Sequence, residues 1–217
     1  MRSLLTLITI CAALPLAAAT HRVTLLQFSD YHSHPLPFYA AEGADRGGLA
    51  RAIRYLRDQK HHGALVFNGG DTMNHGAPAW SDKYGCIEWP WLNGVVDAMA
   101  FGNHDADYGF AAFARCRESI RYPLLSANTS GMQRYEVFER DGVRIGVFAV
   151  AGNDFRSLVK TDGFTFSDPI AAARDVVHTL RDLEHVDAVV MIGHEHLADD
   201  DALAKAVSGI DLIFGSH

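Results

Sequence analysis

Short apolar runs alternate along this chain with segments of helical periodicity, and no other feature constrains the fold as strongly. The runs are brief and rich in β formers, and they lie at residues 23–28, 64–67, 98–101, 188–192 and 211–214. Between the first two, Leu49, Ile53 and Leu56 recur at the spacing of one helix face. Residues 169–183 show the same spacing. Strands that alternate with helices predict an α/β protein built on a largely parallel sheet.

The remaining elements are expected from turn residues and shorter patterns. Residues 135–139 and 143–150 flank Asp141 and Gly142, a dipeptide that suits the tight turn of a β-hairpin. We also expect helices over residues 91–97, around 110–114 and around 202–207, a short strand at 124–128 and a loop from 74 to 90. The acidic run 199–201 would then cap the N-terminus of the last helix, where negative charge is favourable.

Each of the five apolar runs ends in side chains that commonly bind metal ions. These side chains are Asp30 and His32, Asp71, Asn103 and His104, His194, and His217. In open α/β sheets, ligands bind beyond the carboxyl ends of the strands. We therefore expect all five strand ends to meet at the same edge of one sheet. Any single end fits an ordinary surface loop equally well, and it is the repetition that favours a site.

The collected ligands contain oxygen and nitrogen but no thiolate. This set argues against a structural zinc knot and suits a catalytic site for Zn, Mn, Fe or a similar divalent ion. Six ligands exceed what one tetrahedral ion needs, so two ions that share a bridging carboxylate account for them most simply. Such a pair, about 3.5–4 Å apart, can clamp the attacking and leaving oxygens of a phosphoryl displacement.

Composition bounds the class of protein. With 217 residues, of which 48% are hydrophobic, the chain can bury the core of one domain, or of most of one. The formal net charge of −7 argues against nucleic-acid binding, which needs a basic face. Cys86 and Cys116 remain once the leader described next is removed. They fit either a disulfide or two buried thiols.

The first nineteen residues have the pattern of a secretory signal peptide. Arg2 precedes an apolar stretch from Leu4 to Leu16, and residues 17–19 are alanines that suit cleavage. We therefore expect a mature catalytic domain over residues 20–217 and a secreted or periplasmic location. No other stretch approaches about 18 uninterrupted apolar residues, so no stable membrane insertion is expected.

The strand-end motifs together carry a resemblance to a known family. The blocks are Asp30-x-His32, Gly70-Asp71, Gly102-Asn103-His104-x-x-Asp107, Gly193-His194 and Gly215-x-His217. They resemble the calcineurin-like metallophosphoesterases over about residues 23–217. Residues 96–104, 123–128 and 209–213 are similar to the secreted 5′-nucleotidase and UDP-sugar hydrolase branch.

This resemblance implies a two-sheet sandwich with helices outside and a site with two divalent metal ions. Asp30 and His32 would hold one ion, Asp71 would bridge, and the second ion would be held by Asn103, His194 and His217. His104, oriented by Asp107, would form a His–Asp dyad. Asp105 is assigned no chemistry. The implied substrate is a small-molecule phosphoester, most simply a nucleotide, hydrolysed by an activated hydroxide.

One departure from the family pattern concerns the last block. In the family it continues to a further His or Gln, whereas this chain stops at His217. We therefore expect a fragment of a longer precursor that lacks the last ligand of the first ion. The carboxyl-terminal substrate-binding domain of this branch would also be absent.

Several alternatives remain open at this point. The same scaffold serves enzymes for UDP-sugars, 2′,3′-cyclic nucleotides or sulfur esters, and a non-enzymatic metal- or nucleotide-binding module is a more distant possibility. His34 and His196 each follow a ligand histidine by two residues and are treated as outside the site. Asn128 fits a neighbour of the site or a plain strand-end cap. Four further histidines are expected on the surface: His61, His62, His178 and His185.

Overall fold

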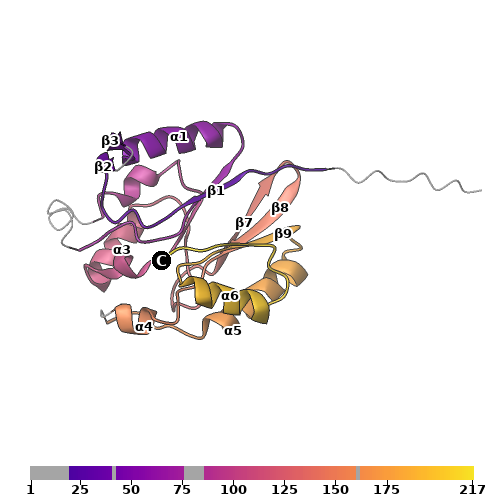
Figure 1. The fold of residues 1–217 in the computed structure, drawn as a ribbon. Helices are drawn as coiled ribbons and strands as arrows, with labels where there is room; N and C mark the ends of the chain where they lie inside the picture. Colours follow the sequence, from indigo (N-terminus) through magenta and orange to yellow (C-terminus); the bar gives the residue numbers. More distant parts are fainter. Residues whose placement is uncertain (1–19, 41–42, 76–85, 160–161) are drawn as a thin grey trace, which may run out of the picture.

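Two sheets pack face to face, with helices on their outer sides (Figure 1). The computed structural model describes residues 20–40, 43–75, 86–159 and 162–217. The expected signal peptide, residues 1–19, and much of the expected loop 74–90 lie outside these residues. Among the described residues, no helix is both long and apolar enough to cross a membrane.

The first sheet is parallel and has the strand order β1-β4-β5-β6. Its strands are β1 (Leu25–Phe28), β4 (Leu65–Asn68), β5 (Ala98–Ala100) and β6 (Leu124–Leu125). Its outer side carries α1 (Leu49–His61) and α3 (Phe110–Glu118). Alternate residues of each strand serve the two faces, so Val66 and Met99 pack with these helices while Phe67 and Ala98 face the other sheet.

The second sheet has the order β10-β9-β8-β7, with an antiparallel pair at one edge. Its strands are β7 (Tyr135–Arg140), β8 (Val143–Phe148), β9 (Ala188–Ile192) and β10 (Leu212–Phe214). Its outer side carries α5 (Pro169–His178) and α6 (Leu197–Ala206). The expected hairpin is confirmed, because both residues of the Asp141-Gly142 turn have positive φ, 51° and 76°.

Shorter elements complete the fold. They are β2 (Phe38–Ala40), β3 (Gly43–Arg46), α4 (Phe155–Leu158), the 3-10 helices η1 (Trp89–Leu92) and η2 (Asn103–Ala106), and the π-helical turn η3 (Thr179–Leu183) that continues α5. The α/β class and the two-sheet sandwich are therefore confirmed. The expectation that all five strand ends lie on one sheet is wrong, because β1, β4 and β5 belong to one sheet and β9 and β10 to the other.

Two expected helices differ from the observed ones. The expected helix over residues 91–97 is wrong: Pro90 lies in the first turn of η1, and Gly94, with φ of 74°, lies two residues past its end. The last helix starts at Leu197 rather than near Ala202. The acidic run therefore lies inside its first turns instead of ahead of it.

Cys86 and Cys116 form a disulfide, with Cα atoms 5.0 Å apart and a sequence separation of 30 residues. The bond ties the segment before η1 to α3. We expect a reductant to lower the free energy of unfolding by about 2–4 kcal/mol, because it frees a long loop in the unfolded chain. Urea unfolding with and without dithiothreitol measures this. A Cys86→Ala/Cys116→Ala variant should not respond to the reductant, and an equal response of both proteins would contradict the prediction.

Candidate metal centre

Asp71 stands at the centre of the converging strand ends. It follows β4, its side chain is 1% exposed, and its Oδ2 lies 3.2 Å from Nε2 of His194 and 3.6 Å from Nε2 of His32. It belongs to two groups of possible ligand atoms, each within 4.8 Å: one with His32 and His104, the other with Asp30 and His194. A carboxylate shared in this way is placed as a bridging ligand would be.

The loops after β1 and β4 are joined backbone to backbone. The amides of Asp30 and His32 donate to the carbonyls of Gly70 and Asp71, at 3.1 and 3.0 Å. Asp30, His32 and Asp71 have φ of 53°, 48° and 52°, a region that non-glycine residues rarely adopt. Such strain persists where the surroundings hold it, and it clusters at functional sites.

The surroundings of Asp30 lower the pKa of its carboxyl group. Burial acts to raise its pKa, but hydrogen bonds with His32 and Ser29 and the charge of His194 outweigh this and bring the pKa down to about 2. The side chain is therefore an anion at neutral pH, as a metal ligand must be.

Asp105, next to the predicted dyad, is buried and holds backbone. Its carboxylate accepts hydrogen bonds from the amides of Gly102, Asp71 and Thr72, at 3.0, 3.1 and 2.9 Å. Burial, and then the charge of Asp71, raise its pKa to about 7. It fastens the loop after β5 to the loop after β4, which supports leaving it out of the chemistry.

Replacing Asp105 should therefore cost stability. In Asp105→Ala the three buried amides lose their acceptor, and we expect the free energy of unfolding to fall by about 3 kcal/mol or more. Asp107→Ala, a change to a partly exposed acid of the same loop, should lower it by less than about 1 kcal/mol. Urea unfolding of both variants measures the difference, and equal losses would contradict the structural role.

His194 is completely buried and oriented by backbone. Its Nδ1 donates to the carbonyl of Gly69 at 2.7 Å, which turns Nε2 towards Asp71. Burial acts to lower its pKa, but the close contact with Asp71, the charge of Asp71 and the Gly69 carbonyl together outweigh this and raise it. Nε2 of His194 and Oδ1 of Asn103 are both buried and lack hydrogen-bond partners among the described residues. Buried polar atoms without hydrogen-bond partners fit metal ligands. For His194, the bond from Nδ1 to the Gly69 carbonyl fits as well, because ligating histidines typically donate their other ring nitrogen to such a partner.

His104 and Asp107 form the predicted pair. Nδ1 of His104 lies 2.7 Å from Oδ2 of Asp107, and this hydrogen bond is the main cause that raises the pKa of His104. The amide of His104 donates to Oδ1 of Asp71 at 2.9 Å, and its ring lies edge-on to that of His32, with centroids 4.9 Å apart. The imidazole is thus partly exposed beside the ligand cluster.

His217 lies beside His194 but joins a further group. The two ring centroids are 5.0 Å apart, while Nδ1 of His217 is 3.9 Å from Oδ2 of Asp154. His196 stacks on His217 with centroids 4.4 Å apart, and its Nε2 is 3.1 Å from the same Asp154 oxygen. Asp154, His196 and His217 therefore form a third possible ligand group.

Sequence reasoning missed Asp154 and set His196 aside. Asp154 follows β8 at the same end of the second sheet as His194, so its strand-end position was the available signal. The residues between the end of β8 and Asp154 are mostly apolar, so the strand-end pattern alone does not reveal Asp154.

The other weighed candidates lie outside the cluster. His34 is exposed and contacts the carbonyl of His32. Asn128 bonds the backbone of Ala151 in both directions, at 2.8 and 2.9 Å, and acts as a brace between loops. The histidines expected on the surface are exposed, as predicted: His61, His62, His178 and His185.

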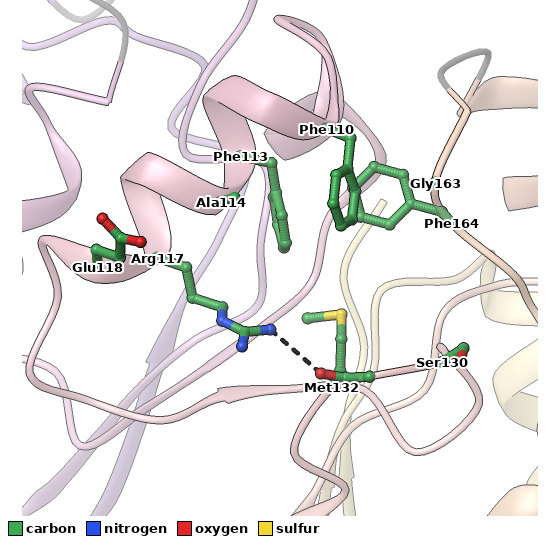
Figure 2. A pocket seen from close by; sticks show the side chains of 10 residues that line it. Phe110, Phe113, Ala114, Arg117, Glu118, Ser130, Met132, Gly163 and Phe164 are labelled. Carbon is green, nitrogen blue, oxygen red and sulfur yellow. Dashed lines mark hydrogen bonds between the residues drawn. The ribbon is translucent and has the colours of Figure 1, made fainter.

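A separate apolar pocket of about 270 Å³ lies between α3 and two loops (Figure 2). Phe110, Phe113 and Phe164 form its walls, and Arg117 closes one side by donating to the carbonyl of Gly131 at 3.2 Å. None of the predicted metal ligands lines it. The site indicated by the strand ends is therefore distinct from this pocket.

Comparisons with known proteins agree with this geometry. Residues 23–217 match the family model described as calcineurin-like phosphoesterase. Protein UshA of Yersinia enterocolitica is 28% identical over 225 residues, covering 91% of this chain and 40% of that protein. A 5′-nucleotidase of Vibrio cholerae is 27% identical over 239 residues, covering 95% of this chain and 42% of its own length.

Solved structures share the fold. A 5′-nucleotidase precursor from Thermus thermophilus superposes with a TM-score of 0.80 at 25% identity, covering 90% of this chain and 41% of that chain. The NAD nucleotidase of Haemophilus influenzae, at 22% identity, also gives 0.80, covering 90% of this chain and 38% of its own. The chain spans about two fifths of the length of these relatives.

Proposed function

Because the chain belongs to the calcineurin-like phosphoesterase family, we propose that it is the catalytic domain of a secreted or periplasmic metal-dependent enzyme that hydrolyses 5′-nucleotides. The observation that carries this proposal is the position of Asp71, whose Oδ2 lies 3.6 Å from His32 and 3.2 Å from His194, beside the His104–Asp107 pair. The relatives named 5′-nucleotidase supply the substrate class. The leader pattern of residues 1–19 supports export.

Two divalent ions, such as Zn, Mn or Fe, would be held by this set. Asp30 and His32 would hold the first, Asn103, His194 and His217 the second, and Asp71 would bridge them. When bound, the ions would lower the pKa of water and neutralise the charge of the phosphate. The carbonyl of Gly69 would fix the tautomer of His194 so that Nε2 is free to ligate.

His104 would supply the proton chemistry. Asp107 holds Nδ1, so the other ring nitrogen is left to face the substrate. An imidazolium there can stabilise charge on the phosphoryl oxygens and protonate the leaving oxygen. The raised pKa of His104 favours the protonated form that this role requires.

A substrate panel tests the proposed specificity. The full-length protein should release phosphate from 5′-AMP faster than it cleaves UDP-glucose, 2′,3′-cyclic AMP or a thiosulfate ester. Preference for one of the latter would keep the metal chemistry and replace the nucleotidase assignment. Bound metal without turnover on any ester would indicate a binding module instead.

A further inference from the structure

The residue that follows His32 contacts a buried acid, Glu88, which lies outside the proposed ligand set. The Oγ of Ser33 donates to Oε2 of Glu88 at 3.0 Å, and both side chains are at most 1% exposed. A buried carboxyl therefore accepts a hydrogen bond from the residue that directly follows a proposed metal ligand.

The contacted loop is strained and needs support. Ser33 has φ of 56°, which extends the left-handed backbone already seen at Asp30 and His32. The amide of Ser33 donates to the carbonyl of Thr72 at 3.1 Å, and its Oγ accepts from the amide of Asn74 at 3.3 Å. Ser33 thus ties the loop after β1 to the loop after β4, and its hydroxyl is held by the carboxyl of Glu88.

Glu88 is itself firmly held in place. It directly precedes η1 and lies two residues after Cys86, whose disulfide with Cys116 fastens this segment to α3. The second carboxyl oxygen, Oε1, is buried without a hydrogen-bond partner among the described residues. An unsatisfied oxygen on a buried acid costs free energy of folding. We therefore expect Glu88 to have a function at the adjacent strained loop that compensates for this cost.

We propose that Glu88 is a positioning residue that holds the Tyr31–Ser33 loop so that Asp30 and His32 present their ligand atoms to the first ion. The inference rests on the proposed two-ion site and adds a residue that neither touches substrate nor ligates metal. Partners of this kind, which orient a ligand without binding the ion, typically change metal affinity by about 10–100-fold.

Metal affinity of the full-length protein tests the proposal directly. In a Zn²⁺ titration against a competing chelator, Glu88→Ala should weaken binding of one ion by about 10–100-fold and leave the other nearly unchanged. Glu88→Gln, which can still accept from Ser33, should recover most of the affinity. At limiting Zn²⁺, kcat for 5′-AMP should fall while KM stays constant, and excess Zn²⁺ should restore kcat.

A matched control separates positioning from stability. Asp97 is another largely buried acid, and it accepts from the amide of Val66 and from Lys60, both at 2.8 Å, at the start of β4. Asp97→Ala should lower the melting temperature without changing Zn²⁺ affinity. If Glu88→Ala fails to fold, Ser33→Ala decides, because it removes only the hydroxyl and should still weaken one ion.

Wild-type Zn²⁺ affinity in Glu88→Ala, or in a folded Ser33→Ala when Glu88→Ala does not fold, would overturn the proposal. Equal weakening of affinity by Asp97→Ala would also overturn it, since the effect would then follow stability. These outcomes are independent of the proposed substrate. A wild-type protein that binds two ions but releases no phosphate would refute the nucleotidase assignment and leave the affinity comparison valid.

Discussion

Replacing His104 with Asn should lower kcat for 5′-AMP by about 10²–10⁴-fold, while the protein keeps its bound metal. Nδ1 of the imidazole is held by Asp107 beside the ligand cluster, and in the proposed mechanism the change removes a proton donor and no ligand. Steady-state kinetics and metal analysis of the same preparation measure the two effects separately.

The chain contains a chemically matched control for this variant. His178 and Asp182 form an exposed pair with 3.5 Å between Nε2 and Oδ2, on the far side of the second sheet. His178→Asn should leave kcat unchanged. Loss of metal in His104→Asn would make His104 a ligand, and an unchanged kcat would remove it from the mechanism.

Replacing Asp71 with Asn should lower the metal content more than replacing His104 with Asn does. In the proposed site this carboxylate bridges the two ions, so a neutral side chain should weaken the binding of both at once. Because each ion contributes several kcal/mol to stabilising the charge that develops in the reaction, we expect turnover to fall by about 10³-fold or more. Metal analysis after dialysis, together with phosphate release, checks this.

The contrast with a variant of a single group sharpens this prediction. Asn103→Ala removes a ligand that only one ion would use, so it should lower the content of one ion and leave the other in place. If Asp71→Asn also lost only one ion, Asp71 would be an ordinary ligand and not the bridge.

The ligand-type residues at the strand ends could be predicted because they follow from local sequence. Runs such as 64–67 and 188–192 are short and apolar, and Asp71 and His194 follow them within a few residues. The spacing of His104 and Asp107 likewise allows the pair within one turn of η2. These features need no knowledge of how distant segments pack.

The division into two sheets could not be derived from periodicity alone. β4 and β9 are both buried on two faces and read alike, and only long-range pairing decides that they belong to different sheets. The two-sheet sandwich is implied by the family resemblance and not by the pattern of the strands.

The tertiary roles of single acids were equally hidden. Asp105 and Asp107 stand two residues apart in one polar loop, yet one braces buried amides and the other holds His104. Glu88 lies 55 residues from Ser33 in sequence, and only the packing of the segment before η1 against the loop after β1 brings them together. Burial of a polar side chain depends on these distant contacts.

A chelator titration that follows both the number of metal ions bound per chain and phosphate release from 5′-AMP decides whether the protein is a two-metal hydrolase. We expect two divalent ions in the full-length protein, loss of activity as they are removed, and recovery when Zn²⁺ or Mn²⁺ is returned. Phosphate release that continues unchanged after both ions are removed would contradict it.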